Sequence, residues 1–169
     1  MIDFAGAAGS VAIAALGWVG LNLFGKPILG LRDKRREALE AAERYAYVGL
    51  HGTPREEYQK RALAALHDVG NSLRAYARES SLATKLYCRM LRYDLDFAAR
   101  AVLGLGAAAR GEYRIDERAR RLTLHALFVA LGSTHHLSPG EIAVAKAEMK
   151  NWHDANRDAT TFSSAMDNA

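Results

Sequence analysis

The longest uncharged stretch of the sequence lies near its start, where residues 4–24 contain no ionisable side chain. Ser10 and Asn22 are its only clearly polar residues. Because an α-helix rises about 1.5 Å per residue, these residues would form a helix ~32 Å long, which matches a hydrocarbon core of about 30 Å. The stretch therefore predicts a single membrane-spanning helix, with residues 1–25 as the transmembrane anchor.

The flanks of this stretch indicate how the anchor is oriented. Asp3 precedes the apolar residues and the basic residues follow them, which is the reverse of a cleavable secretory signal. The positive-inside rule then places the N-terminus outside and residues 26–169 in the cytoplasm. Trp18, Phe24 and Lys26 lie toward the cytoplasmic end, where aromatic rings and an ammonium group suit the headgroup region.

Composition favours a bacterial source, so the membrane of the predicted anchor would be a bacterial inner membrane. The chain has 17 Arg and 32 Ala but only 6 Lys, a bias typical of bacterial genomes rich in GC. Cys88 is the single cysteine, so the fold needs no intramolecular disulfide and suits a reducing cytoplasm.

The alternative for residues 4–24 is a helix rich in glycine and alanine that is buried in a soluble core or covered by oligomerisation.

Small residues recur at four-residue spacing within the apolar stretch. Such rows let two helix backbones approach closely in lipid, where no hydrophobic force drives helices together. The spacing favours self-association of the anchor as a homo-oligomer. The residues are Gly6, Ser10 and Ala14 on one row, and Gly9 and Gly17 on a neighbouring row.

A cluster of basic residues follows the anchor. Between residues 26 and 36 five cations face a single acid, Asp33, and this excess equals the net charge of +4 of the whole chain. Cations at this position lie close to an anionic cytoplasmic leaflet and each add about 1 kcal/mol to surface binding. We therefore predict a collar that binds anionic membrane lipids. It comprises Lys26, Arg32, Lys34, Arg35 and Arg36.

The remaining sequence has the apolar spacing of helices and no alternating pattern typical of strands. Residues 26–50 predict a juxtamembrane basic amphipathic helix, with a break or bend at Gly25-Lys26-Pro27. Residues 51–157 predict a cytoplasmic helical bundle, and residues 158–169 a flexible tail. The predicted fold class is all-α, a transmembrane helix followed by a bundle of about five or six helices. These helices are expected at 27–48, 54–79, 82–92, 95–110, 116–131 and 139–156.

Cap residues mark several of these boundaries. The segments Thr53-Pro54-Arg55-Glu56 and Ser138-Pro139-Gly140-Glu141 each have the form of a capping box with proline at the first helical position. Short polar side chains are expected to begin three more helices, and glycines to end three. The starting residues are Ser80 or Ser81, Asp94 and Asp116, and the ending residues are Gly49, Gly111 and Gly132.

The apolar stripe of each helix predicts which face is buried. In the helix expected at 82–92, Leu86, Met90 and Cys88 are predicted to lie inside. In the helix expected at 116–131, the inner positions are predicted to be Ala119, Leu122, Ala126 and Val129.

Few residues carry a pattern typical of catalysis or metal binding. Cys88 lies among Lys85, Arg89 and Arg92, cations that would lower the pKa of an exposed thiol, but a small buried hydrophobic residue is the favoured interpretation. The late histidines have none of the spacings of zinc or di-iron sites, so no metal or cofactor is predicted. They are His125, His135, His136 and His153.

A run of arginines in the second half of the chain raises the question of anion binding. Acids at Glu112, Asp116 and Glu117 interleave with them, whereas nucleic-acid binding needs a clustered basic stripe. Nucleic acid is therefore not an expected partner. The arginines are Arg100, Arg110, Arg114, Arg118, Arg120 and Arg121.

Together these features predict a protein anchored in the inner membrane by one span, which acts as a helical scaffold or accessory subunit of a membrane complex. Its expected partners are membrane lipids, a protein and a second copy of the chain, and catalysis is not expected. The alternative is a membrane-tethered enzyme or redox sensor that uses Cys88 or the late histidines.

Overall fold

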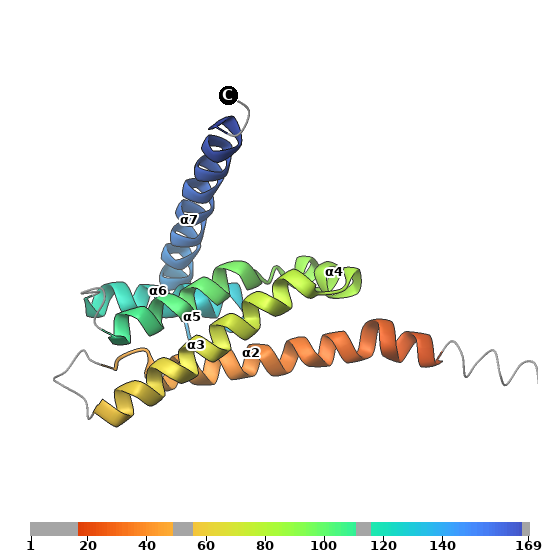
Figure 1. The fold of residues 1–169 in the computed structure, drawn as a ribbon, viewed down its shortest axis with the longest axis horizontal. Helices are drawn as coiled ribbons and strands as arrows, with labels where there is room; N and C mark the ends of the chain where they lie inside the picture. Colours follow the sequence, from red (N-terminus) through yellow and green to blue (C-terminus); the bar gives the residue numbers. More distant parts are fainter. Residues whose placement is uncertain (1–16, 49–55, 111–115, 167–169) are drawn as a thin grey trace, which may run out of the picture.

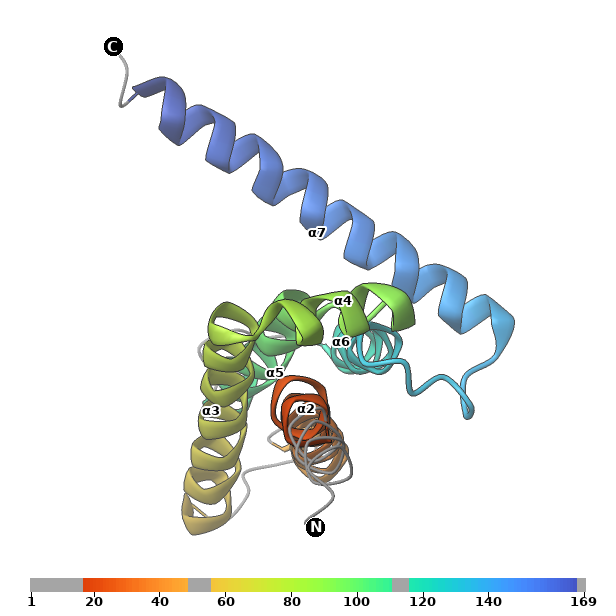
Figure 2. The ribbon, with the colours of Figure 1, turned by 90° about the vertical axis from the view of Figure 1, so that its right-hand side faces the viewer.

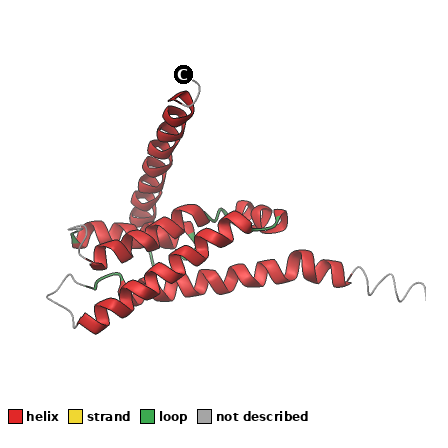
Figure 3. Cartoon of the chain, in the orientation of Figure 1, coloured by secondary structure: helices red, strands yellow, loops and turns green. Residues whose placement is uncertain are grey.

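The structure, a computed structural model, describes residues 17–48, 56–110 and 116–166. Every regular element in these ranges is a helix (Figure 3), which confirms the all-α class for them. The predicted capping segment at residues 53–56 falls largely outside them, as do the predicted helix ends at Gly49 and Gly111. In chain order the elements are η1 (Leu21–Gly25), α2 (Lys26–Tyr45), α3 (Glu56–Glu79), α4 (Leu82–Leu91), α5 (Leu95–Arg110), α6 (Glu117–Ala130) and α7 (Pro139–Met166).

The centre of the bundle is the pair formed by α3 and α5, which have the most extensive contact of any two helices (Figure 1). α2 packs on α3, and α6 packs on α5. α7 packs on α6 and then leaves the bundle (Figures 1 and 2). The described ranges therefore confirm the predicted helical bundle. Its largest fully buried side chains include Leu31, Leu66, Leu73, Leu105, Leu127 and Leu131.

Three helices begin where a short polar side chain accepts a hydrogen bond from the backbone, as predicted. Asp94 Oδ1 accepts from the N–H of the third residue of α5 at 2.9 Å, and Asp116 Oδ1 accepts likewise from α6 at 2.7 Å. Ser81, rather than Ser80, caps α4 at 3.3 Å. Each cap satisfies an N–H that the helix itself leaves unpaired.

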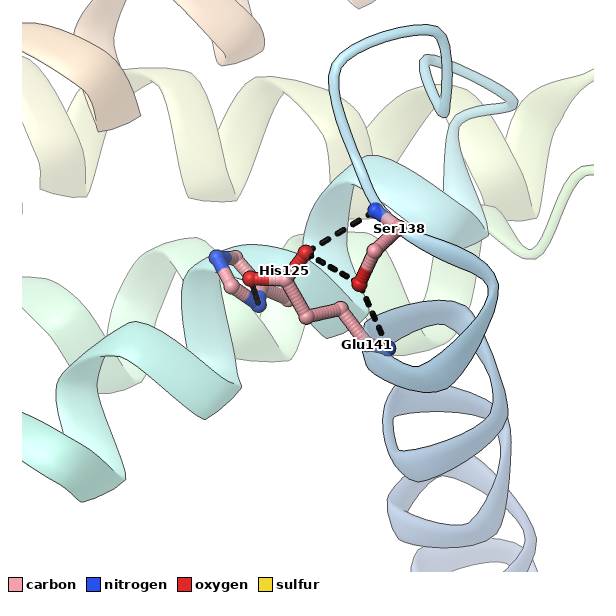
Figure 4. A network of polar contacts seen from close by, with 3 residues as sticks. All are labelled: His125, Ser138 and Glu141. Carbon is pink, nitrogen blue, oxygen red and sulfur yellow. Dashed lines mark hydrogen bonds and ion pairs between the residues drawn. The ribbon is translucent and has the colours of Figure 1, made fainter.

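α7 begins at the predicted capping box (Figure 4). The Ser138 hydroxyl donates to Glu141 Oε2 at 2.7 Å and accepts the Glu141 N–H at 3.3 Å, while Glu141 Oε2 also accepts the Ser138 N–H at 2.9 Å. These hydrogen bonds from Ser138 hold the pKa of the Glu141 carboxyl below its usual value, because they favour the charged form. The local spacing of the two residues was sufficient to predict this geometry.

The pairing of α3 with α5 depends on a glycine. A Cβ placed on Gly70 of α3 would lie 2.7 Å from Leu103 Cγ and 3.3 Å from the Ala99 carbonyl oxygen of α5. A Cβ placed on Gly104 of α5 would meet nothing within 4 Å. The backbones therefore approach closely at Gly70, where the packed interior leaves no room for a methyl group.

We expect Gly70→Ala to lower the free energy of unfolding by about 1–3 kcal/mol, because the added methyl group overpacks the contact between α3 and α5. Gly104→Ala is the matched control and should raise that free energy by up to about 1 kcal/mol, because alanine favours a helix and meets no neighbour. Urea denaturation followed by circular dichroism measures both. Equal shifts in the same direction would contradict the expectation.

The helix does not break at Gly25-Lys26-Pro27, where the sequence predicted a break or bend. Gly25 has helical dihedral angles, with φ −63° and ψ −58°, and the Lys26 N–H donates to the carbonyl of Leu21. This wider hydrogen-bonded turn is the π-helical η1, and such a turn gives room to a proline ring that would clash with a regular helix. The helix that begins in the apolar stretch therefore continues directly into α2.

α7 also extends further than predicted. It runs to Met166, whereas the sequence predicted an end near Asn156. No glycine or proline follows Gly140, so no helix-breaking residue stops it. The small polar residues after Asn156 form no apolar stripe, and this is why periodicity did not reveal a helix there. The flexibility predicted for residues 158–169 stays a prediction.

α6 buries an arginine among its leucines. The Arg120 side chain, in a residue only 4% exposed, donates from Nη1 to the Val48 carbonyl at 2.6 Å and to the Ala46 carbonyl at 3.3 Å. Its Nη2 donates to the Ala108 carbonyl at 3.0 Å. These carbonyls lie just past α2 and in the last turn of α5, where a helix leaves its carbonyls unpaired and carries partial negative charge. Burial lowers the pKa of the Arg120 guanidinium.

Arg120 also explains why the predicted inner face of α6 was partly wrong. The buried positions Arg120, Leu124 and Leu127 follow helical spacing, whereas Ala119 is exposed. The prediction counted only apolar residues and so began the stripe at Ala119 instead of Arg120. Ala126 is buried as predicted.

We expect Arg120→Met to lower the free energy of unfolding by about 3 kcal/mol, because methionine fills similar space but leaves three carbonyls without their donor. Arg121→Met is the matched control. Arg121 is exposed and forms an ion pair with Glu117 at 2.9 Å, an interaction worth no more than about 0.5 kcal/mol. Urea midpoints of the two variants check the difference, and equal losses would show that the guanidinium does not carry the contact.

Candidate functional site

The end of the bundle from which the apolar stretch departs is the region that the sequence singles out. Residues 17–20 are helical and lead through η1 into α2, and Trp18 is 68% exposed. Gly17 has open space around its Cα, since an added Cβ would meet nothing within 4 Å. Gly6, Gly9, Ser10 and Ala14 lie outside the described residues, as does the side chain of Phe24.

Among the residues that the structure describes, no helix is both long enough and apolar enough to cross a membrane. Most of the predicted span at residues 4–24 precedes the first described residue, so its transmembrane role stays a prediction.

The start of α2 is fixed to α3. The Tyr76 hydroxyl donates to the Pro27 carbonyl, and the Tyr76 ring lies against Gly30, where an added Cβ would be 3.4 Å from the hydroxyl oxygen. Proline has no N–H of its own, so this contact makes use of the polar group that remains. Packing between α2 and α3 therefore fixes the start of α2, which follows directly on residues 17–25.

The predicted lipid-binding collar divides into two groups. On the exposed surface, Lys34 pairs with Glu37 at 2.7 Å and Arg36 lies 3.7 Å from Glu40. Such exposed ion pairs are worth about 1 kcal/mol or less, so both cations can exchange their partner for a lipid phosphate. Lys26 and Arg32 are also exposed.

Arg35 points into the bundle instead. Its Nε donates to the Leu131 carbonyl at 2.6 Å and its Nη2 to the Gly132 carbonyl at 3.4 Å, at the C-terminal end of α6. The guanidinium also lies 5.8 Å from the centre of the Tyr93 ring. Arg35 occurs one turn after buried Leu31, on the inner stripe of α2, and this spacing is the pattern that could have revealed its role.

α4 differs most from its prediction. Leu86 is 63% exposed and Met90 is 79% exposed, so the prediction that both lie inside was wrong. Together with Leu82, at 80%, they recur every four residues and form one stripe along the helix. Thr84 and Cys88 are buried on the opposite face. α4 is therefore an amphipathic helix whose leucines and methionine face away from the bundle.

Cys88 is buried, as its favoured interpretation predicted. Burial raises the pKa of its thiol, since the thiolate is the form that desolvation penalises. The nearby cations Lys85 and Arg89 are exposed and do not offset this effect. A raised pKa lowers the thiolate fraction at neutral pH, and the thiolate is the nucleophile.

We expect iodoacetamide to alkylate Cys88 at least about tenfold more slowly in the folded chain than in the chain unfolded by urea at the same pH, because burial limits both access and thiolate formation. Since the folded pKa is higher, the folded rate should keep rising at pH values where the unfolded rate has levelled off. Mass spectrometry of quenched samples gives both rates. A fast thiol in the folded chain at neutral pH would restore the redox-sensor alternative.

The late histidines do not converge on one site. His125 Nδ1 lies 3.8 Å from Glu141 Oε1 (Figure 4), and His153 Nε2 lies 2.5 Å from Asp94 Oδ2. The rings of His135 and His136 stack edge to face with centroids 4.8 Å apart. In the described part of the chain no three histidine, cysteine or acidic side chains are grouped as metal ligands.

The arginines considered for anion binding also divide. Arg120 is buried and Arg121 pairs with Glu117, so α6 presents no continuous basic stripe of these residues. Arg100 of α5 instead lies 5.2 Å from the centre of the Trp152 ring of α7. It lines an open groove with cations of α3 and α7, and two acids also reach this groove. The charged residues of the groove are Arg74, Arg78, Arg100, Lys150, Asp96 and Asp154.

Comparisons with protein-family models, with curated protein sequences and with solved structures give no match to this chain.

Proposed function

We propose that the chain is a single-pass protein of a bacterial inner membrane, with its N-terminus outside and its bundle in the cytoplasm, and that it acts as a scaffold or accessory subunit. The observation that carries this proposal is the exposure of Trp18 and Leu21 at the described end of the apolar stretch. A helix buried in the chain's own core would have such side chains covered by other helices. The described helices leave them exposed, as a continuation into lipid requires.

The charges beside this exit point support the same orientation. Lys26, Arg32 and Arg36 are exposed and Lys34 is half-buried. These four cations follow the proposed exit point, on the flank that the positive-inside rule assigns to the cytoplasm. Arg35 holds α2 to α6 and is left out of the lipid contact. The proposed collar therefore has four members instead of five.

The scaffold role assigns two surfaces to other proteins. In the membrane, the rows Gly6, Ser10, Ala14 and Gly9, Gly17 would pair two copies of the chain. In the cytoplasm, α7 stands away from the bundle and offers a protein partner its own surface and the groove beside Trp152 (Figure 2). With four cations against two acids, this groove favours an acidic segment of the partner.

The alternative, a membrane-tethered enzyme or redox sensor, has less support. Cys88 is buried with a raised pKa, which disfavours a reactive thiol. His125 and His153 each lie beside a carboxylate, in separate places, whereas a shared catalytic or metal site needs its groups within reach of one another.

Full-length chain expressed in bacteria should stay in the membrane fraction after an alkaline carbonate wash. In intact spheroplasts its bundle should resist added protease, and it should be digested once they are lysed. Ile13→Arg combined with Leu16→Arg should move the chain out of the membrane, because each charge near the centre of a span costs about 3 kcal/mol. Immunoblots of the fractions measure all three outcomes.

Ile13→Leu combined with Leu16→Ile is the matched control, since it alters the same positions without adding charge, and it should behave like the wild type. Folded wild-type chain in the soluble fraction without detergent would remove the proposal. Digestion of the bundle in intact spheroplasts would instead reverse the proposed orientation.

A further inference from the structure

The outward face of α4 carries exposed large apolar side chains that the anchor itself does not explain. Leu82, Leu86 and Met90 form a continuous stripe, while soluble proteins rarely leave large apolar side chains exposed next to one another. The stripe is not a misplaced core face, because Thr84 and Cys88 already fill the inner side of the helix. Something outside the bundle is needed to cover it.

The charged residues beside the stripe indicate that the surface covering it is anionic. Lys85, Arg89 and Arg92 are exposed, and residues 80–93 contain no acid. Lys85 and Arg89 lie one turn apart along one border of the apolar stripe. A short helix with large apolar residues on one face, cations beside them and no acids is typical of a helix that lies in the surface of an anionic bilayer.

The position of α4 fits such a surface. α4 contacts both η1 and α2, so it lies at the end of the bundle from which the apolar stretch departs (Figure 1). In Figure 2, which looks along α2 from this end, α4 runs across the view while α2 is seen end on. A bilayer crossed by the helix that continues from α2 would therefore extend roughly parallel to the axis of α4.

We propose that α4 is an interfacial helix that docks on the anionic cytoplasmic leaflet. Leu82, Leu86 and Met90 enter the boundary between headgroups and acyl chains, and Lys85 and Arg89 contact lipid phosphates. This inference rests on the proposed function, because residues 4–24 bring α4 to the membrane. Tethering raises the effective concentration of lipid at α4, so a face too small to bind alone becomes occupied.

The test uses the full-length chain in vesicles that contain phosphatidylglycerol, with a nitroxide spin label on Leu86→Cys in a Cys88→Ala background. Collisions of the label with oxygen, which concentrates in lipid, are compared with collisions with a water-soluble nickel complex. The label should meet oxygen more often than nickel. The same label on Arg118→Cys, in the first turn of α6 and exposed, is the matched control and should meet nickel more often.

The charges are tested separately. Lys85→Glu combined with Arg89→Glu should return the Leu86 label to water, as should vesicles of phosphatidylcholine alone. Circular dichroism confirms that the variants stay helical. A Leu86 label exposed to nickel in a chain that remains in the vesicles would overturn the docking of α4 and leave the anchor in place. A label that meets neither reagent would show that a protein covers α4, and loss of the chain from the vesicles would overturn the anchor itself.

Discussion

The bundle depends on one buried charge that has no carboxylate partner among the described residues. Arg120 gives its hydrogen bonds to carbonyls at the ends of α2 and α5, so its charge is balanced by the partial negative charge of helix C-termini. Carbonyls at helix ends must find donors wherever water is excluded. One guanidinium supplies those donors for two helices from a third, and it thereby holds three helices in a single arrangement.

Arg35 makes the reciprocal contact. Arg120 reaches from the start of α6 to the end of α2, and Arg35 reaches from α2 to the carbonyls of Leu131 and Gly132 at the end of α6. The two arginines thus fix α2 and α6 to each other at two separate points along their lengths. Because α2 continues from the apolar stretch, this pair of contacts also fixes the orientation of the bundle relative to the proposed anchor.

The sequence was most informative where structure is decided locally. Asp94, Asp116 and Ser138 were recognised as caps because a cap needs only a short polar side chain and a free N–H three residues later. Arg35 was predicted in the lipid collar and Arg120 was left off the predicted inner face of α6, because periodicity counts only apolar residues. An inward arginine is explained only by carbonyls that the fold brings from elsewhere in the chain. The buried face of α4 was predicted wrongly for a different reason. Leucines on a stripe predict burial, but they do not say whether protein or lipid covers them.

Whether lipid covers the apolar stripe of α4 decides how firmly the bundle would be held against the proposed membrane. A single span alone leaves a cytoplasmic domain free to rotate and tilt about its exit point. The contact of Tyr76 with Pro27 and Gly30 makes α2 part of the bundle immediately after the span, which limits tilt between the two. A second contact through α4, away from the axis of α2, would limit the tilt of the bundle further, while the whole chain could still turn about the membrane normal. Under the proposed anchoring, the groove beside Trp152 and the projecting α7 would then face the cytoplasm at a fixed height and angle, the geometry that a scaffold needs to hold a partner at the membrane.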